Sequence, residues 1–369
     1  PDKTPPSIAE GQQSATDVLG EQPVTFNVTA QDAETSRLQF TWTASAGTLG
    51  EPTHSDTTSA VSWTAPLCLP AGTPATITLT VTDDGGFTAT RTFTVSVNRC
   101  PAPRIVTTEG HTLALRPDGT VWSWGLNAYG ELGREDASVI DPTPKRVPGL
   151  TGVTAIDGSG YNSLAARADG SVWAWGYNDE GQLGTGDSAE FVTTPTQVPG
   201  LSAISDVKAG SQHFLALDSS GAVWSWGYNS NGQLGDGTTT QRFTPAKVTG
   251  LGTVTAIAAG SSFALALASD GTVWSWGSNF DGQLGNGTNV RSTTPVQVLT
   301  LSGVTAIAAG SSFALALRND GTVWAWGANY SGQLGNGTTF ESYTPVQVPT
   351  LSGVTALAAG EEHGLALLS

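Results

Sequence analysis

Hydrophobic and polar residues alternate along most of this chain, in short stretches separated by turns. Residues 304–348 show the pattern clearly. An apolar stretch over residues 304–309 is followed by Phe313, Leu315 and Leu317, which alternate with alanine and arginine. A period of two residues places successive side chains on opposite faces of an extended backbone, so both stretches are predicted to be β-strands. The absence of a helical period predicts an all-β protein.

Two further strands complete this unit. Asp320-Gly321 predicts a hairpin turn of type I′, in which both central residues have positive φ. The chain returns through residues 322–327, with Trp324 and Trp326 on one face. A glycine-rich reversal then leads to residues 344–348, an edge strand in which a proline does no harm. Four short strands per unit predict a propeller blade.

The same unit occurs five times at a nearly constant period. The first tryptophans of the copies are Trp122, Trp173, Trp224, Trp274 and Trp324, at spacings of 51, 51, 50 and 50 residues. A fixed period of this length marks a repeat architecture. The predicted blades cover residues 105–155, 156–206, 207–256, 257–306 and 307–356, and the remaining residues begin a sixth unit.

Each copy carries two tryptophans one residue apart, which we interpret as the core between neighbouring sheets. A buried aromatic side chain contributes roughly 2–3 kcal/mol of transfer free energy. The regularity of the pairs disfavours the alternative, a ligand-stacking role. The predicted core residues are Trp122, Trp124, Trp173, Trp175, Trp224, Trp226, Trp274, Trp276, Trp324 and Trp326.

The order of residues within a unit supports a family resemblance. Residues 308–335 follow the order Ala-Ala-Gly-x-x-Phe-x-Leu-Ala-Leu-x-x-Asp-Gly-Thr-Val-Trp-x-Trp-Gly-x-Asn-x-x-Gly-Gln-Leu-Gly. This order resembles the RCC1 repeat, the blade of the regulator-of-chromosome-condensation family, and the resemblance covers about residues 104–369. It implies an RCC1-like β-propeller. Because such propellers commonly have seven blades, five full repeats and the start of a sixth are expected to be a fragment of a longer propeller.

The first hundred residues have a different organisation. Strands are predicted over residues 24–30, 38–44, 60–64, 75–83 and 90–98, with turn residues between them, and this spacing predicts a β-sandwich. The stretches at residues 40–49 and 79–86 resemble bacterial immunoglobulin-like (Ig-like) or PKD-like surface modules. The predicted domains are a tether over residues 1–22, an Ig-like β-sandwich over 23–100, a linker over 101–104 and an RCC1-like β-propeller over 105–369.

The cysteines, Cys68 and Cys100, both lie in this first part. We predict a disulfide between them, which implies an oxidising compartment; two buried thiols are the alternative. Four acidic turn residues would hold Ca²⁺ only if their two turns meet, and otherwise they are ordinary turn residues. They are Asp32, Glu34, Asp83 and Asp84. No metal site is predicted from them.

The charge balance excludes several classes of partner. The net charge is −16; residues 1–100 hold 4 basic and 10 acidic residues, and the rest of the chain holds 11 and 21. Affinity for nucleic acid depends on neutralising phosphates, so a chain without a basic cluster predicts no nucleic-acid partner. No apolar run is long enough for a transmembrane segment. A lipid anchor upstream of residue 1 remains an alternative.

No catalytic arrangement is evident. Three of the histidines share one repeat position with asparagine and phenylalanine, which predicts a structural role; the residues are His111, Asn162, His213, Phe263, Phe313 and His363. The motifs of metalloproteases, serine hydrolases and phosphate-binding loops are absent. The chain is therefore predicted to be no enzyme and to need no cofactor.

The loops before the last strand of each unit differ, while the rest of the unit is nearly constant. Loops on a rigid scaffold usually carry recognition, and aromatic or arginine residues are typical anchors. We predict a partner-binding rim made of Phe191, Arg242, Phe243, Phe340 and Tyr343. The alternative is that these loops are simply solvated, with the aromatic rings tucked beneath them.

Together these features predict a secreted or cell-surface bacterial protein, non-enzymatic, that uses the propeller to bind a protein or a glycan. Self-assembly is a further interaction to consider. The alternatives are a structural subunit of a surface filament and a secreted inhibitor of the RCC1-like β-lactamase-inhibitor type. An exchange factor like the founding members of the family fits less well, because those proteins are intracellular and this chain is acidic with a predicted disulfide.

Overall fold

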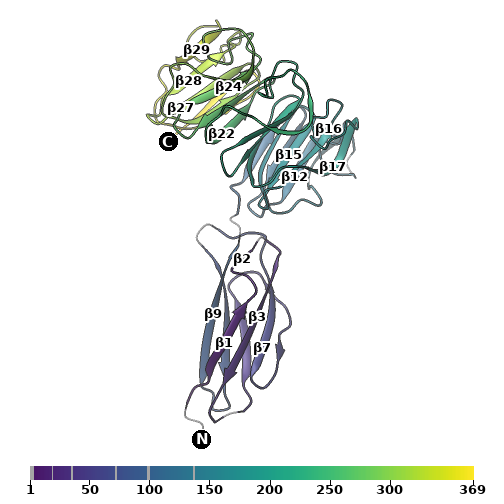
Figure 1. Cartoon of the computed structure of the whole chain (residues 1–369), viewed down its shortest axis with the longest axis vertical. Helices are drawn as coiled ribbons and strands as arrows, with labels where there is room; N and C mark the ends of the chain where they lie inside the picture. Colours follow the sequence, from purple (N-terminus) through teal and green to yellow (C-terminus); the bar gives the residue numbers. More distant parts are fainter. Residues whose placement is uncertain (1–3, 19, 35, 71–72, 98–99, 136–137) are drawn as a thin grey trace. The chain divides into compact units, whose positions relative to one another are not determined.

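The computed structural model describes residues 4–18, 20–34, 36–70, 73–97, 100–135 and 138–369 (Figure 1). All regular secondary structure in these residues is β-strand. The chain divides into two compact regions, an N-terminal region of mainly residues 1–102 and a repeat region of mainly residues 103–369. The described residues contain no helix that could cross a membrane.

Two β-sheets form the N-terminal region. The first has the order β1-β3-β7-β5, with β6 also paired to β7, and its strands are β1 (Ser7–Gln13), β3 (Pro23–Gln31), β5 (Thr48–Leu49), β6 (Thr53–His54) and β7 (Thr58–Thr64). The second has the order β2-β9-β8-β4, and its strands are β2 (Asp17–Val18), β4 (Gln39–Ala44), β8 (Ala75–Thr82) and β9 (Thr88–Val97). Described pairs are antiparallel except β2 with β9.

The tether predicted over residues 1–22 is wrong where β1 (Ser7–Gln13) and β2 (Asp17–Val18) form strands. Strand β1 pairs with β3, and β2 pairs with β9. Their side chains are mostly exposed, because β1 lies at the edge of its sheet. A polar edge strand has the composition of a linker, but its backbone groups are satisfied by the neighbouring strand.

The core of this region lies between the two sheets. Alternate residues of β3 and β8 are buried, and the fully buried side chains include Trp63, Phe26, Ile77 and Leu79. The period-2 pattern of the sequence is the direct cause, since it supplies one apolar face per strand. The predicted strands are found within one or two residues, and only their end at residue 98 lies outside the described residues. A closer likeness to Ig-like modules stays a prediction.

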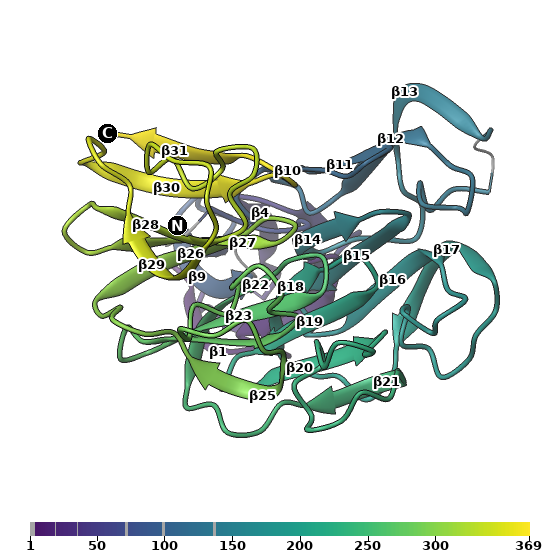
Figure 2. The ribbon, with the colours of Figure 1, turned by 90° about the horizontal axis from the view of Figure 1, so that it is seen from above.

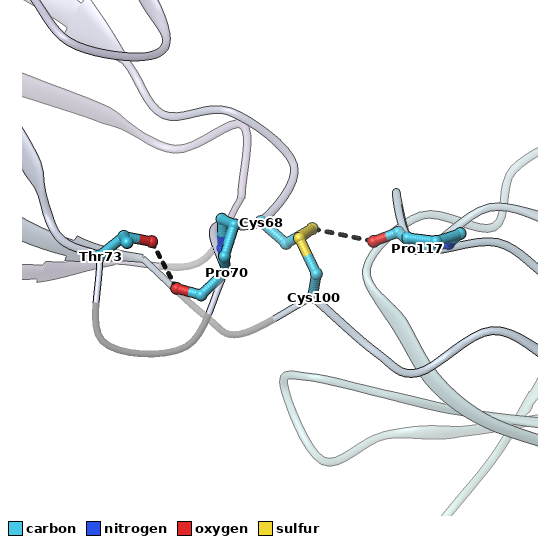
Figure 3. The surroundings of a disulfide bond; sticks show 5 residues. All are labelled: Cys68, Pro70, Thr73, Cys100 and Pro117. Atoms are coloured by element: carbon cyan, nitrogen blue, oxygen red, sulfur yellow. Dashed lines mark hydrogen bonds between the residues drawn. A yellow bond between two sulfur atoms is a disulfide. The ribbon is translucent and has the colours of Figure 1, made fainter.

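Cys68 and Cys100 form a disulfide within the N-terminal region (Figure 3). The bond joins the segment before β8 to the segment after β9. Beside it, the Cys100 N–H donates a hydrogen bond to the Leu69 carbonyl at 3.0 Å, and Thr73 Oγ1 donates to the Pro70 carbonyl at 2.6 Å. The base of the β8–β9 hairpin is therefore fastened by both covalent and backbone bonds.

The repeat region consists of five four-stranded sheets and one two-stranded sheet, which follow one another around a common centre (Figure 2). The first three units are β10 (Arg104–Thr107), β11 (His111–Leu115), β12 (Val121–Leu126) and β13 (Ile140–Arg146); β14 (Val153–Ser159), β15 (Asn162–Arg167), β16 (Val172–Tyr177) and β17 (Phe191–Val198); and β18 (Ile204–Ala209), β19 (His213–Asp218), β20 (Val223–Gly227) and β21 (Arg242–Lys247). The others are β22 (Val254–Ala259), β23 (Phe263–Ala268), β24 (Val273–Gly277) and β25 (Ser292–Gln297); β26 (Val304–Ala309), β27 (Phe313–Arg318), β28 (Val323–Gly327) and β29 (Ser342–Gln347); and β30 (Val354–Ala359) with β31 (Gly364–Leu368).

Each four-stranded sheet is antiparallel in chain order, with the innermost strand first and the proline-containing strand at the outer edge. The predicted blade boundaries fall inside the innermost strands: the fifth unit begins with β26 at Val304, whereas residue 307 was predicted. The short apolar stretch at residues 304–309, just before Gly310, is therefore one whole strand.

The predicted type I′ hairpin is wrong. In the turn between β27 and β28 the positive φ falls on Gly321 alone (77°), and the Gly321 N–H donates to the Arg318 carbonyl at 2.9 Å. Asp320 keeps a negative φ because its carboxylate Oδ1 accepts hydrogen bonds from the N–H and hydroxyl of Thr322. The turn is thus a three-residue loop closed by one left-handed glycine, the second common hairpin type.

The second tryptophan of a pair is buried where two units meet. Trp276 is fully buried with Leu215 and Val223 of the preceding unit, and its Nε1–H donates to the Gln233 carbonyl at 2.9 Å. The first tryptophan of the same pair, Trp274, is only half-buried. The two members of a pair therefore have different roles, and the second is the larger contributor to the contact between sheets.

The sixth unit has an uncovered apolar face in the described chain. Leu315 is 4% exposed and packs against Leu357 of the next unit. Its counterpart in the sixth unit, Leu365, is 60% exposed, and Leu367 is 64% exposed. The difference arises because burial of these leucines depends on a neighbouring sheet and not on their own strand.

Candidate functional site

One edge of the repeat region carries all its long loops. In an antiparallel four-stranded unit, the turn between the first two strands and the loop between the last two emerge at the same edge. In the second unit these are residues 160–161 and 178–190. We call this edge of the repeat units the loop edge. The tight Asp-Gly hairpins lie at the opposite edge.

An asparagine fixes each long loop, and it is fully buried in all units but the first. Asn329 Oδ1 accepts the Leu334 N–H at 2.9 Å, and its Nδ2 donates to the carbonyls of Thr338 and Phe340, both at 3.0 Å. The other units make the same bond to leucine through Asn127, Asn178, Asn229 and Asn279. Because each asparagine side chain holds the backbone of its own loop, the other residues of that loop can vary without changing the path of the backbone.

Exposed large apolar residues gather at the loop edge. They are Val139, Ile140, Tyr161, Phe191, Phe243, Phe280, Val290, Tyr330 and Phe340. Between residues 138 and 347, Leu299 is the one exposed large apolar residue that lies elsewhere. A concentration of apolar side chains on one side of a soluble protein is typical of an interaction surface.

The structure divides the five predicted rim residues into two groups. Phe243 and Tyr343 lie against Gly181 and Gly282 of the preceding unit's loop, where a side chain would have no room. Thr193 and Thr293 occupy the same position in the second and fourth units. These two rings therefore serve a contact between units, as the alternative interpretation of the loops expected. Arg242 pairs with Asp236 of its own loop at 3.4 Å.

Phe340 is the most exposed ring of the predicted rim, at 76%, followed by Phe191 at 44% and Phe243 at 37%. The prediction missed Tyr129, Tyr161, Phe280 and Tyr330. Tyr161 could have been found by aligning the turn before the histidine position, because the other units have glycine, glutamine, serine or glutamate there.

Four aromatic rings meet where the first and second units join. The Tyr129 ring centroid lies 5.0 Å from those of Tyr161 and Tyr177 and 6.5 Å from that of Phe191. We call these four residues the tyrosine cluster. The Tyr177 hydroxyl donates to Asp179 Oδ2 at 2.9 Å, and this bond raises the pKa of Tyr177.

A buried carboxylate lies next to this cluster in sequence. Glu131 is fully buried, and its Oε2 accepts the Tyr129 N–H at 2.7 Å. Its Oε1 has no hydrogen-bond partner among the described residues, and burial raises the pKa of the group. The other four full units have a glutamine here, whose oxygen accepts the same backbone bond.

The histidine position lies between units. His111 is buried, with Nδ1 at 2.8 Å from Thr108 Oγ1 and Nε2 at 2.8 Å from Ser163 Oγ of the next unit. His213 is fully buried, and neither of its ring nitrogens has a hydrogen-bond partner among the described residues. Burial lowers the pKa of both imidazoles to about 4. His363 is exposed.

Replacing His213 by phenylalanine is expected to stabilise the repeat region. The fourth and fifth units already hold phenylalanine at this position, and the change removes two buried nitrogens without partners, worth about 1–3 kcal/mol. Because the pKa of this imidazole is lower in the folded state than in the unfolded state, the wild-type protein loses stability as the pH falls below the unfolded-state pKa. The advantage of the variant in free energy of unfolding should therefore grow by about 3 kcal/mol between pH 7 and pH 4. Urea unfolding across this pH range measures both effects.

The matched control is His111→Phe. This variant loses the bonds to Thr108 and Ser163 and leaves two hydroxyls without that partner, so it should be less stable than the wild type at pH 7. Its acid sensitivity should fall as for His213→Phe, because the same pKa shift is removed. If both variants changed the free energy of unfolding by the same amount at pH 7, the hydrogen bonds of His111 would contribute nothing to stability.

A central cavity of about 930 Å³ lies where the innermost strands of all six units converge. Two basic and four acidic side chains line it: Arg104, Lys208, Glu109, Asp157, Glu361 and Glu362. Lys208 Nζ lies 2.7 Å from Asp206 Oδ2, and Arg104 Nη1 lies 3.7 Å from Asp206 Oδ1. Asp157 Oδ2 accepts the Ala209 N–H of the next unit at 3.1 Å, and burial raises its pKa. The Asp157 bond joins the second unit to the third, and the pair of Arg104 with Asp206 joins the first unit to the third. The described residues contain no cluster of three or more side chains suited to a metal ion.

Repeated four-stranded sheets around a common centre define a propeller-type repeat protein. The family model described as "Regulator of chromosome condensation (RCC1) repeat" matches residues 118–166, 169–217, 220–267, 270–317 and 320–367. The chain belongs to the RCC1-repeat family. Each match starts at an Asp-Gly or Ser-Gly turn and ends in the second strand of the next sheet, so a family repeat is shared between two sheets. The two-stranded sixth sheet is the second half of the fifth repeat.

The chain is similar to several characterised proteins over its repeats. It is 35% identical to protein pim1 of Schizosaccharomyces pombe over 34% of this chain and 27% of the relative. It is 40% identical to the human E3 ubiquitin-protein ligase HERC2 over 36% of this chain and 3% of the relative. Yeast RCC1 (Prp20), solved with Kap60, superposes with a TM-score of 0.63 at 28% identity, over 72% of this chain and 67% of that one. The chain therefore matches only a minor part of these two curated relatives.

Proposed function

We propose that this protein is a non-enzymatic recognition protein that binds another protein through the loop edge of its repeat region. The observation that carries the proposal is the gathering of exposed apolar side chains on loops whose backbone is fixed by buried asparagines. A rigid frame with variable, partly aromatic loops suits protein recognition. Yeast RCC1 (Prp20), which is similar to this chain, has been solved bound to another protein, Kap60.

We also propose that the protein is bacterial and acts outside the cell or at its surface. Disulfides persist in oxidising compartments, and Cys68 and Cys100 form one. The net charge of −16 supports a protein partner over a nucleic acid, since phosphate binding needs basic clusters. A glycan is the alternative ligand.

Affinity capture from envelope and culture extracts of the source organism tests the role of the loop edge. The bait variants are the wild type, a triple variant with Phe280, Tyr330 and Phe340 changed to alanine, and Leu299→Ala as the control away from this edge. Capture of one protein by the wild type and the control, reduced at least tenfold in the triple variant, supports the proposal. Equal capture by all three would contradict it.

Guanine-nucleotide exchange is the competing function, because the resemblance to the founding members of the family implies it. A direct assay follows release of labelled GDP from a small GTPase in the presence of the full chain. Accelerated release would replace the proposal of a non-enzymatic protein. No change in the release rate is the result expected here.

A further inference from the structure

We infer that the tyrosine cluster binds a cationic side chain, lysine or arginine, presented by a segment of a partner protein. This inference rests on the proposed function, since it gives the chemistry of the partner that the loop edge would take. The cluster joins the first and second units, and two of its rings are open to solvent: Tyr161 is 39% exposed and Phe191 is 44% exposed.

The orientation of the rings favours a cation over a sugar. Tyr129 is inclined by 59° to Tyr161, by 66° to Tyr177 and by 64° to Phe191. The face of Tyr129 therefore points in a different direction from the faces of the other three rings, and the four rings do not form one flat platform. A sugar stacks on a flat face, whereas an ammonium or guanidinium group is attracted by the negative face of any ring within about 6 Å.

Carboxylates surround the cluster on the second unit's loop. Asp179 accepts the Tyr177 hydroxyl at 2.9 Å, and Glu180 follows it in sequence. Neither carboxylate takes part in the ion pairs found between described residues. The loop-edge segments of the second unit, residues 160–161 and 178–190, contain acidic residues and no lysine or arginine. An incoming cation would therefore find both aromatic faces and uncompensated negative charge, which is the complementarity that steers charged partners.

The fifth unit provides an internal comparison. The Tyr330 hydroxyl donates to Asp281 Oδ1 at 3.1 Å, so this tyrosine also has a carboxylate partner. Tyr330 is 66% exposed, and no second ring packs on it among the described aromatic pairs. It has the tyrosine and the carboxylate but lacks the neighbouring rings. It should therefore bind a cation much more weakly.

Fluorescence anisotropy with a labelled short peptide of alternating lysine and glycine tests the inference. A twin peptide with glutamine for lysine and a neutral chitin oligosaccharide are the comparison probes. At low salt the lysine peptide should bind the wild-type chain at least tenfold more tightly than its glutamine twin. Tyr161→Gln and Asp179→Ser, which introduce the residues of the third unit, should each weaken binding about three- to tenfold. Tyr330→Ser should bind as the wild type does.

Lysine-peptide affinity that is unchanged in Tyr161→Gln and Asp179→Ser would overturn the inference. So would binding of the oligosaccharide alone, lost in Tyr161→Gln, because the cluster would then be a glycan site. If partner capture depends on Phe280, Tyr330 and Phe340 but not on Tyr161, the proposed function survives and the inference fails. If capture depends on no loop-edge residue, both fail. Because Tyr161 is partly exposed, its replacement should leave the fold intact. An unchanged circular dichroism spectrum of Tyr161→Gln will show that this variant is folded.

Discussion

Replacing Trp276 by alanine is expected to lower the free energy of unfolding of the repeat region by about 3–5 kcal/mol, the usual cost of emptying a buried tryptophan site. The side chain is fully buried between the third and fourth units, and the change also leaves the Gln233 carbonyl without its hydrogen bond. Because each unit packs mainly against its neighbours, the loss should also weaken the cooperation between the two halves of the region. Urea unfolding followed by circular dichroism measures the change.

The matched control is Trp124→Ala, at the same repeat position in the first unit. Trp124 is half-buried, because no described repeat unit precedes it to cover the ring. Its removal should cost less than half as much as that of Trp276, since less apolar area is uncovered. Equal losses in the two variants would show that the tryptophan stabilises its own sheet and not the contact between sheets.

The fold could be predicted from the sequence because its causes are local and repeated. The alternation of apolar and polar residues along each strand and the period of the tryptophans can be read directly from the sequence, and both are found in the structure. Strand β1 escaped prediction for the opposite reason: most of its side chains are polar, and the backbone bonds to β3 make it a strand. The turn at Asp320 escaped because a side-chain bond to Thr322 decides its geometry.

The candidate site could be predicted only in part. The variable loops were identifiable as the proposed recognition side, since the frame around them is constant. Which of their aromatic rings face solvent depends on how one unit stacks on the next. Phe243 is placed over Gly181 of the preceding unit, whereas Tyr161 joins Tyr129 across a unit boundary. Contacts between residues of different units have no signature in the repeat pattern itself.

Removal of the disulfide is expected to destabilise the N-terminal region and leave the repeat region unchanged. Cys68 and Cys100 are 32 residues apart, and closing a loop of this length in the unfolded chain contributes about 3–4 kcal/mol in the chain-entropy model. In the double variant Cys68→Ser, Cys100→Ser, the backbone N–H of residue 100 can still donate to the Leu69 carbonyl. The folded hairpin of β8 and β9 should therefore persist. The change should therefore act mainly on the unfolded state.

Hydrogen exchange with mass spectrometry separates the two regions of the full chain. Amides of β8 and β9 should exchange faster in the double variant by a factor that matches about 3 kcal/mol, while those of β23 and β24 keep their protection. The wild type with its disulfide reduced should behave as the double variant does, because both lack the same constraint. If the loss were below about 1 kcal/mol, the unfolded N-terminal region would already hold its cysteines close together, and the covalent bond would be redundant for folding.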